Sequence, residues 1–237
     1  MTEFTTWRSL VDGAKISAIP DSGMFQSPII QWWAGEGIES DDGQPTEGWV
    51  DTIAELEATD VESPVYRQDQ EGFEAVDYSE GDNGHDFNPS SFPTGDDPVS
   101  WAALLYVPEN PSDQIVLYWG NDGAEENFEI RFQDDETIRF NLSGAGTDAI
   151  IGFDTGQWIT VGGSYEGGSD GQLKAFHNTA VEVGETATGK IGTNHYNIGY
   201  RGANNDFYSD VFVAEVIFSD VEESEQAYED YHNDRLG

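Results

Sequence analysis

The chain has 237 residues and a mass of 26.1 kDa, which suits one domain with its own hydrophobic core. Asp and Glu number 47 against 9 Lys and Arg, so the formal net charge is −38. A chain this acidic repels phosphate backbones and anionic lipids, which excludes nucleic-acid binding and polybasic membrane docking as main functions. Cysteine is absent, which excludes disulfides, thiolate metal sites and a cysteine nucleophile.

The charge also predicts the environment of the protein. Self-repulsion of this size strains a compact state in dilute buffer, whereas molar salt shortens the Debye length to about 3 Å and nearly abolishes the repulsion. We therefore predict a salt-adapted protein. The N-terminus lacks a basic stretch followed by an apolar one, and no apolar run reaches the ~18 residues of a spanning helix, so we expect neither an export signal nor membrane insertion.

The first 28 residues are interrupted by Gly13, Pro20, Gly23 and Pro28 and show no strand pattern. We expect an N-terminal arm over residues 1–28 and one domain over residues 29–237. A short segment that carries many apolar groups usually has a partner. The arm is therefore predicted to dock onto another protein or a second copy through its apolar side chains, which are Phe4, Trp7, Leu10, Val11 and Ile19.

Short apolar runs recur after residue 100 and predict seven strands of a β-sandwich. Two of them, 127–132 and 137–142, alternate apolar and polar side chains and are expected to pair as an antiparallel hairpin. The run 101–107 has no such alternation, as in a strand buried on both faces, although a short buried helix would look the same. The predicted strands cover residues 101–107, 114–119, 127–132, 137–142, 158–161, 172–177 and 211–218.

The remaining segments carry turn and helix signals. Residues 34–48 and 79–97 are rich in Gly, Asp and Pro and are predicted to be loops, and the two glycines of 161–165 indicate a turn at a strand end. Asp220 and Glu223 have the spacing of a capping box. They predict a C-terminal helix over about residues 221–233, with Asp220 as its N-cap.

The order of these elements resembles a known fold. The matching motifs are Gln31-Trp-Trp33, Trp49-Val-Asp51, Asn197-Ile-Gly-Tyr200 and Asp206-Phe-Tyr208, the last followed by a strand and a capped helix. Together they resemble the laminin G-like, or concanavalin A-like, jelly roll, in the variant common in viral tail and capsid-surface proteins, including those of haloarchaeal tailed viruses. The resemblance implies an all-β, two-sheet antiparallel jelly-roll sandwich with a short C-terminal helix, and makes residues 55–60 a surface connection.

The predicted strands offer no catalytic pair. A retaining glycosidase needs two carboxylates about 5 to 5.5 Å apart, which residues i and i+2 of one strand supply. Glu129 is followed by Arg131, and Glu215 by Ile217, so neither strand carries the pair. The four histidines also lack the spacing of a metal or catalytic motif. We predict that the protein is not an enzyme; a carboxylate pair in a groove would revive the glycosidase alternative.

Two loop segments could bind a cation. Calcium prefers six to eight oxygen ligands, and laminin G-like relatives often hold one in loops at the rim of the sandwich. We expect no required cofactor, but calcium is a candidate ligand of Asn121, Asp122 and Asp206. The alternative is that these residues form polar turns on an acidic surface.

Sugar binding needs an exposed aromatic ring beside amide and carboxylate groups. Two segments combine these groups, and the predicted glycan-binding residues are Trp119, Tyr200, Asn204 and Asn205. Most of the seven tryptophans are nonetheless expected in the core, because they lie in strand patterns.

These observations support one leading hypothesis. The protein would be a non-enzymatic structural or adhesion protein on the virion surface of a haloarchaeal virus, in a capsid turret, baseplate or tail fibre. Its partners would be other virion proteins and copies of itself, with a trimer favoured, and host surface glycans would be its candidate ligands. The alternative is a free-standing, calcium-dependent carbohydrate-binding module or lectin of a halophile.

Overall fold

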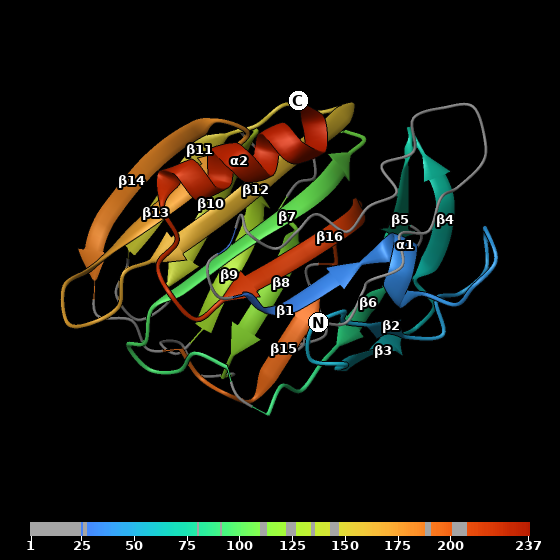
Figure 1. The fold of residues 1–237 in the computed structure, drawn as a ribbon, viewed down its shortest axis with the longest axis horizontal. Helices are drawn as coiled ribbons and strands as arrows, with labels where there is room; N and C mark the ends of the chain where they lie inside the picture. The colour runs from blue at the N-terminus through green and yellow to red at the C-terminus, as the bar shows by residue number, and fades with distance from the viewer. Residues whose placement is uncertain are drawn as a thin grey trace, which may run out of the picture.

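The chain folds as two antiparallel β-sheets packed face to face, with one helix on the outer face of the first sheet (Figure 1). The structure, a computed structural model, describes residues 25, 28–79, 81–90, 92–109, 113–121, 127–133, 136–142, 147–187, 191–200 and 208–237. The predicted two-sheet sandwich with a C-terminal helix is confirmed. No helix in the described ranges is both long and apolar enough to cross a membrane.

The first sheet has the order β14-β13-β12-β7-β16-β5-β4, and β1 pairs with β16 beside this path. All of its pairs are antiparallel. Helix α2 (Glu225–Leu236) lies across its outer face (Figure 1). The strands are β1 (Pro28–Trp33), β4 (Val65–Gln70), β5 (Phe73–Asp77), β7 (Val99–Val107), β12 (Gln157–Tyr165), β13 (Gly171–His177), β14 (Ala180–Ala187) and β16 (Phe212–Ser219).

The second sheet has the order β11-β10-β9-β8-β15-β6-β3-β2, again antiparallel. The predicted hairpin of residues 127–132 and 137–142 is confirmed as the β9–β10 pair. A four-residue helix, α1 (Ala34–Gly37), follows β1. The strands are β2 (Trp49–Val50), β3 (Glu57–Val61), β6 (Gly84–Asp86), β8 (Ile115–Gly120), β9 (Asn127–Gln133), β10 (Thr137–Leu142), β11 (Thr147–Gly152) and β15 (His195–Ile198).

The main core fills the space between the two sheets. Trp101 of β7 packs on Phe140 of β10, and Trp119 of β8 stacks on Phe128 of β9. On the other face of β7, Ala102 packs in a second cluster under α2. Strand β7 is therefore buried on both faces, as its lack of polar alternation predicts, and the helix alternative is excluded.

The glycine pair Gly162 and Gly163 lies inside β12, so the predicted turn over 161–165 is wrong. Neighbouring residues of a strand point to opposite faces. A Cβ on Gly162 would lie 2.5 Å from Cε1 of Tyr228 in α2, and one on Gly163 would lie 2.7 Å from Cζ of Phe140 in the opposite sheet. These glycines let the helix and the second sheet approach the backbone closely from both sides.

Helix α2 begins later than predicted, because Ser224 and not Asp220 is its N-cap. The Ser224 hydroxyl accepts a hydrogen bond from the backbone N–H of Ala227 at 3.2 Å. Glu223 is engaged with the sheet: its carboxylate accepts from Ser219 Oγ at 2.9 Å, and its N–H donates to Ser100 Oγ at 2.8 Å. The capping-box spacing is present in the sequence, but Glu223 bonds to Ser219 and Ser100 instead of capping the helix.

A buried ion pair fixes the last turn of α2. Arg235 donates through Nε to Glu215 of β16 at 2.7 Å, and both side chains are at most 1% exposed. Tyr231 Oη and Gln31 Nε2 donate to the same carboxylate, at 3.0 and 2.5 Å. A buried charge needs such partners, because desolvation alone would cost several kcal/mol.

The end of the predicted arm belongs to the body of the domain. Phe25 is buried, with its ring edge-on to Tyr228 and Tyr231 of α2, and Pro28 opens β1. The rest of the predicted arm lies outside the described residues, including all of its predicted docking side chains, which are Phe4, Trp7, Leu10, Val11 and Ile19.

Of the sixteen strands in the described residues, nine lie outside the seven that the sequence predicts, and four of these nine are β1, β2, β4 and β5. Strand β3 replaces most of the surface connection at 55–60, β6 lies inside the predicted loop 79–97, and β11, β14 and β15 are additional. They are short or lie at sheet edges, where apolar residues are few. Between β13 and β14, Asn178 has φ of 52°, a left-handed conformation that asparagine tolerates.

We expect Gly162→Ala to lower the free energy of unfolding by about 1 to 3 kcal/mol, because the added methyl group would overlap Tyr228. Gly152→Ala on β11 is the matched control, since its Cβ would have no neighbour closer than 4.0 Å. Denaturant unfolding in concentrated salt measures both variants. Equal stabilities for the two would contradict the close packing of α2 on β12.

Candidate functional site

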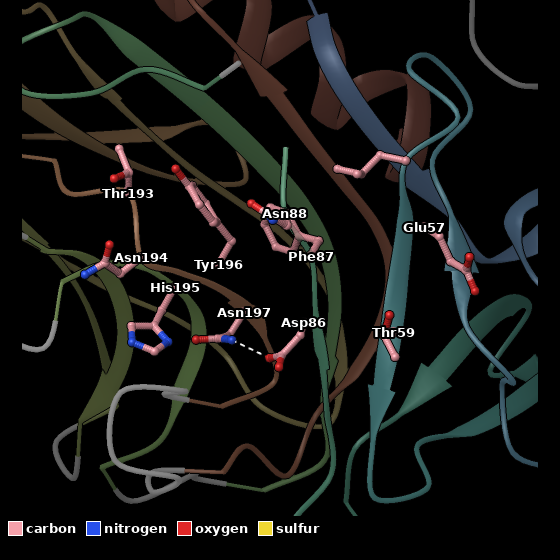
Figure 2. A pocket seen from close by; sticks show the side chains of 11 residues that line it. Glu57, Thr59, Asp86, Phe87, Asn88, Thr193, Asn194, His195, Tyr196 and Asn197 are labelled. Carbon is pink, nitrogen blue, oxygen red and sulfur yellow. Dashed lines mark hydrogen bonds between the residues drawn. The ribbon is translucent and has the colours of Figure 1, made fainter. Parts of the chain in front are cut away.

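A groove opens on the second sheet where β6 ends. The chain leaves the sheet after Asp86, while β3 and β15 flank it on either side, and the N–H of Phe87 still donates to the carbonyl of Tyr196 at 3.0 Å. The groove has a volume of about 700 Å³. Figure 2 shows its two sides, with Asp86 between them. It is lined by Leu56, Glu57, Thr59, Asp86, Phe87, Asn88, Thr193, Asn194, His195, Tyr196 and Asn197.

Strand register brings the central polar groups together. Thr59, Asp86 and Asn197 are direct cross-strand neighbours on the outer face of the sheet. The same row continues through Tyr118 and Glu129, but these side chains are buried, whereas Asp86 and Thr59 are exposed. The row is therefore open to solvent at its groove end.

The carboxylate of Asp86 is held in one orientation. Its Oδ1 accepts a hydrogen bond from Asn197 Nδ2 at 2.6 Å (Figure 2) and another from the Tyr200 hydroxyl. The Tyr200 ring lies over Gly84, where a Cβ would come closer than 3.0 Å, and stacks in parallel on Tyr208 at 5.3 Å between centroids. Asp86 is thus a preoriented acceptor at the centre of the groove.

The rim of the groove is held by Asn121. Its Oδ1 accepts from the N–H of Thr193 at 3.2 Å, and Gly192 packs directly against its amide group. On the other side, Ile191 and Gly95 exchange two backbone hydrogen bonds of 2.8 Å. These contacts fix the turn that carries Thr193 and the strand that follows it.

A buried cluster behind the groove joins β3 to β6. His85 of β6 contacts Asp60 of β3 at 2.9 Å, Tyr78 Oη at 2.7 Å and Thr46 Oγ1 at 3.2 Å. Burial opposes ionisation of Asp60, but hydrogen bonds from His85 and Thr46 outweigh it and lower the pKa of this carboxyl. The cluster holds the two strands in register beneath Thr59 and Asp86.

The loop before β3 is shaped by one aspartate. Asp51 is buried, and its carboxylate accepts from the backbone N–H groups of Gln31, Ile53, Ala54 and Leu56 at 2.9 to 3.1 Å. Multiple backbone donors to one short side chain fix a turn locally. This turn sets the position of Leu56, which forms the apolar part of the β3 wall.

The predicted site residues lie in three different places. Trp119 is fully buried in the core against Phe128, so its ring does not reach the surface. Tyr200 is 2% exposed and supports Asp86 from behind, and Asn121 lies at the groove rim. The other four predicted residues lie outside the described residues; they are Asp122, Asn204, Asn205 and Asp206. Within the described ranges, no three His, Asp or Glu side chains are grouped to hold a metal ion.

The residues that face the groove were missed by sequence reasoning. Asp86 and Asn88 lie in a predicted loop, and His195 lies on a strand of only four residues. One signal was available: residues 195–198 alternate polar and apolar side chains, with His195 and Asn197 on one face. Nothing in the sequence indicates that this face meets β6, which lies more than a hundred residues earlier in the chain.

Comparison with known proteins supports the fold. No family model and no curated protein sequence matches the chain. Among solved structures, domain 4 of an extracellular arabinanase from Geobacillus stearothermophilus, solved with arabinotriose, has a TM-score of 0.61 at 11% identity, covering 86% of this chain and 97% of that one. A structure of botulinum neurotoxin type C has a TM-score of 0.63 at 11% identity. Cell entry of that toxin depends on interaction with two ganglioside molecules.

The similarity covers only part of the larger proteins. The match covers 90% of this chain and 52% of the botulinum neurotoxin chain. A Trypanosoma rangeli sialidase, solved as a covalent intermediate with difluorosialic acid, has a TM-score of 0.59 at 15% identity over 90% of this chain and 33% of its own. At these identities the comparisons establish a shared β-sandwich fold.

Buried tyrosines predict a loss of stability in alkali. Burial raises the pKa of Tyr78, Tyr200, Tyr228 and Tyr231 above the ordinary value of 10.0, and hydrogen bonding to Asp86 adds to it for Tyr200. These phenols stay protonated in the folded state, so the unfolded chain releases its protons first as the pH rises above 10.0. The free energy of unfolding should therefore fall above about pH 10.

Ultraviolet titration of the ten tyrosines measures their ionisation, and circular dichroism in parallel measures the unfolding of the chain. We expect one group to ionise near pH 10 and the buried group only on unfolding. Tyr200→Phe should remove one tyrosine from the late group. Reversible ionisation of all ten tyrosines in the folded protein would contradict the burial described above.

Proposed function

We propose that the protein is a non-catalytic carbohydrate-binding domain and that the groove between β3 and β15 holds the sugar. The observation that carries the proposal is an open groove with a preoriented carboxylate, Asp86, at its centre. Sugar hydroxyls donate well to a fixed carboxylate, because such hydrogen bonds are charge-assisted. The fold shared with a domain solved with arabinotriose adds support.

The other lining groups match the needs of a saccharide. Asn88 and Asn194 are exposed and offer amide groups that both donate and accept, and Thr59 and Thr193 add hydroxyls. Leu56 supplies apolar surface for the C–H face of a sugar ring, while Phe87 and Tyr196 line the groove but are each only 5% exposed, because their rings pack in the core. Because Asn197 and Tyr200 hold Asp86, and Asn121 holds the backbone of Thr193, little ordering of these two residues is required on binding.

Asp86→Ala should weaken binding of an oligosaccharide by at least about tenfold, since it removes the central acceptor together with the hydrogen bonds that it accepts from the buried Asn197 and Tyr200. A glycan array first identifies a ligand, and calorimetry then compares the variants. Asp220→Ala, an exposed aspartate that follows β16, is the matched control and should bind as the parent does. Unchanged affinity in Asp86→Ala would remove the groove from the proposal, and release of shorter sugars from the bound ligand would indicate a glycosidase.

For the biological setting, we propose the surface of a virus that infects a salt-adapted archaeon. Two observations support it: the net charge of −38, which favours a concentrated salt solution, and the sequence resemblance to viral surface jelly rolls. In this setting the domain would be an adhesion module among other virion proteins. A lectin or binding module of the halophile itself is the alternative, which the same groove would serve.

The two settings differ in assembly. If the domain belongs to a virion, we expect an oligomer, with a trimer favoured, when light scattering measures the mass in about 3 M salt, where repulsion is screened. A shortened chain that begins at Gly23 keeps Phe25 and tests the first 22 residues as the interface. Monomers of both chains would favour the free-standing module.

A further inference from the structure

The lining of the groove, as far as the structure describes it, carries negative charge. Of its lining residues, Glu57 and Asp86 are acidic and none is Lys or Arg. Glu57 lies two residues from Thr59, which is the register partner of Asp86, so the two carboxylates are diagonal neighbours on one face. Such neighbours are about 7 to 8 Å apart in a regular antiparallel pair, which is close enough for both to contact one sugar ring. This separation also falls in the range of the two carboxylates of an inverting glycosidase, so the pair meets the condition set above for the glycosidase alternative, which the assay for released shorter sugars tests.

The cations of the described chain are committed elsewhere. Each Lys and Arg among the described residues forms an ion pair outside the groove lining. The pairs are Arg67 with Asp77, Arg131 with Asp113, Arg139 with Asp148, Lys174 with Glu222 and Arg235 with Glu215. Among these residues, none supplies a cation for a sugar carboxylate or sulfate, which are groups that proteins commonly bind through such side chains.

The histidines nearest the groove floor do not offset the excess of carboxylates over cations in the groove lining. His85 faces the interior, where it contacts Asp60 and Tyr78, and is fully buried. His195 lies on the β15 side of the groove and is the one histidine of the described lining. A single histidine opposite two carboxylates does not make the groove attractive to anions.

From this we propose that the groove selects uncharged saccharides and rejects sialylated, uronate-containing and sulfated ones. The inference rests on the proposed function and adds the chemical class of the ligand. Hydroxyl groups donate to Asp86 and Glu57, whereas an anionic group in the same place meets two carboxylates. The domain would therefore differ in specificity from the sialidase and ganglioside-dependent proteins that share its fold.

The test compares matched ligands on the full chain. The neutral oligosaccharide that binds tightest on the array is titrated beside the same molecule with one terminal hydroxymethyl group oxidised to a carboxylate, and beside its sulfated form. At about 0.15 M salt, where the Debye length is about 8 Å, we expect the anionic forms to bind at least about tenfold more weakly. At about 1 M salt, where it is about 3 Å, the difference should shrink. Tryptophan fluorescence verifies that the protein is folded at each salt concentration.

Glu57→Gln removes one charge and keeps the shape of an exposed side chain. We expect the ratio of its affinity for the anionic ligands to its affinity for the neutral ligand to rise by about threefold or more. Glu182→Gln is the matched control: it is an exposed glutamate on β14, an edge strand of the other sheet, and should leave both affinities unchanged.

The outcomes separate the two proposals. Binding of neutral and anionic forms with equal affinity in the parent protein, or tighter binding of the anionic forms, overturns the inference and leaves carbohydrate binding standing. Identical behaviour of Glu57→Gln and Glu182→Gln also overturns it, because the groove charge would then play no part. If no saccharide binds, carbohydrate binding itself fails.

Discussion

The close approach of three layers at one point of β12 organises the domain. Gly162 and Gly163 are neighbours in the strand, so the missing side chains leave space on opposite faces. Tyr228 of α2 fills the space on one face and donates to the carbonyl of Gly163 at 2.6 Å, while Phe140 of the second sheet fills the other. Helix, first sheet and second sheet are thereby fixed relative to one another, and the buried pair of Glu215 and Arg235 secures the far end of the helix.

The groove exists because one strand of the second sheet, β6, ends early. Strand β6 ends after three residues, while the contact of His85 with Asp60 holds β3 on one side and Asn121 holds the turn before β15 on the other. A missing side chain matters here as well, since Gly84 makes room for the Tyr200 ring that supports Asp86. The site is therefore made of exposed polar groups on a rigid frame, the arrangement that binding sites on β-sandwiches require.

Much of the fold could be predicted from the sequence, because its signals are local. Alternation gave β9 and β10, and the unbroken apolar run gave β7, since burial on one or both faces leaves its mark on neighbouring residues. The start of α2 could not be found in this way, because the backbone N–H of Glu223 donates to Ser100, which lies more than a hundred residues away in the sequence. The prediction of a turn at the two glycines of β12 failed for the same reason, because their place inside the strand depends on packing against Tyr228 and Phe140.

The candidate site could be predicted only in part. Tyr200 was predicted to bind sugar and Asn121 to bind calcium, and both lie beside the groove, but as supports for Asp86 and Thr193. Trp119 was chosen by the same rule and is in the core. Residue type and local grouping do not distinguish a side chain that faces a ligand from one that holds it in place. That distinction depends on strand order, which brings β6 beside β15.

The packing of Phe25 on α2 also gives the domain two unlike sides. Phe25 and the helix lie on the outer face of the first sheet, so the start of β1 and the C-terminal helix are on the same side of the sandwich. The groove is on the outer face of the second sheet, with the full thickness of the core in between. A larger assembly joined through Phe25 and α2 would hold the domain from behind, with its groove turned outward and unobstructed.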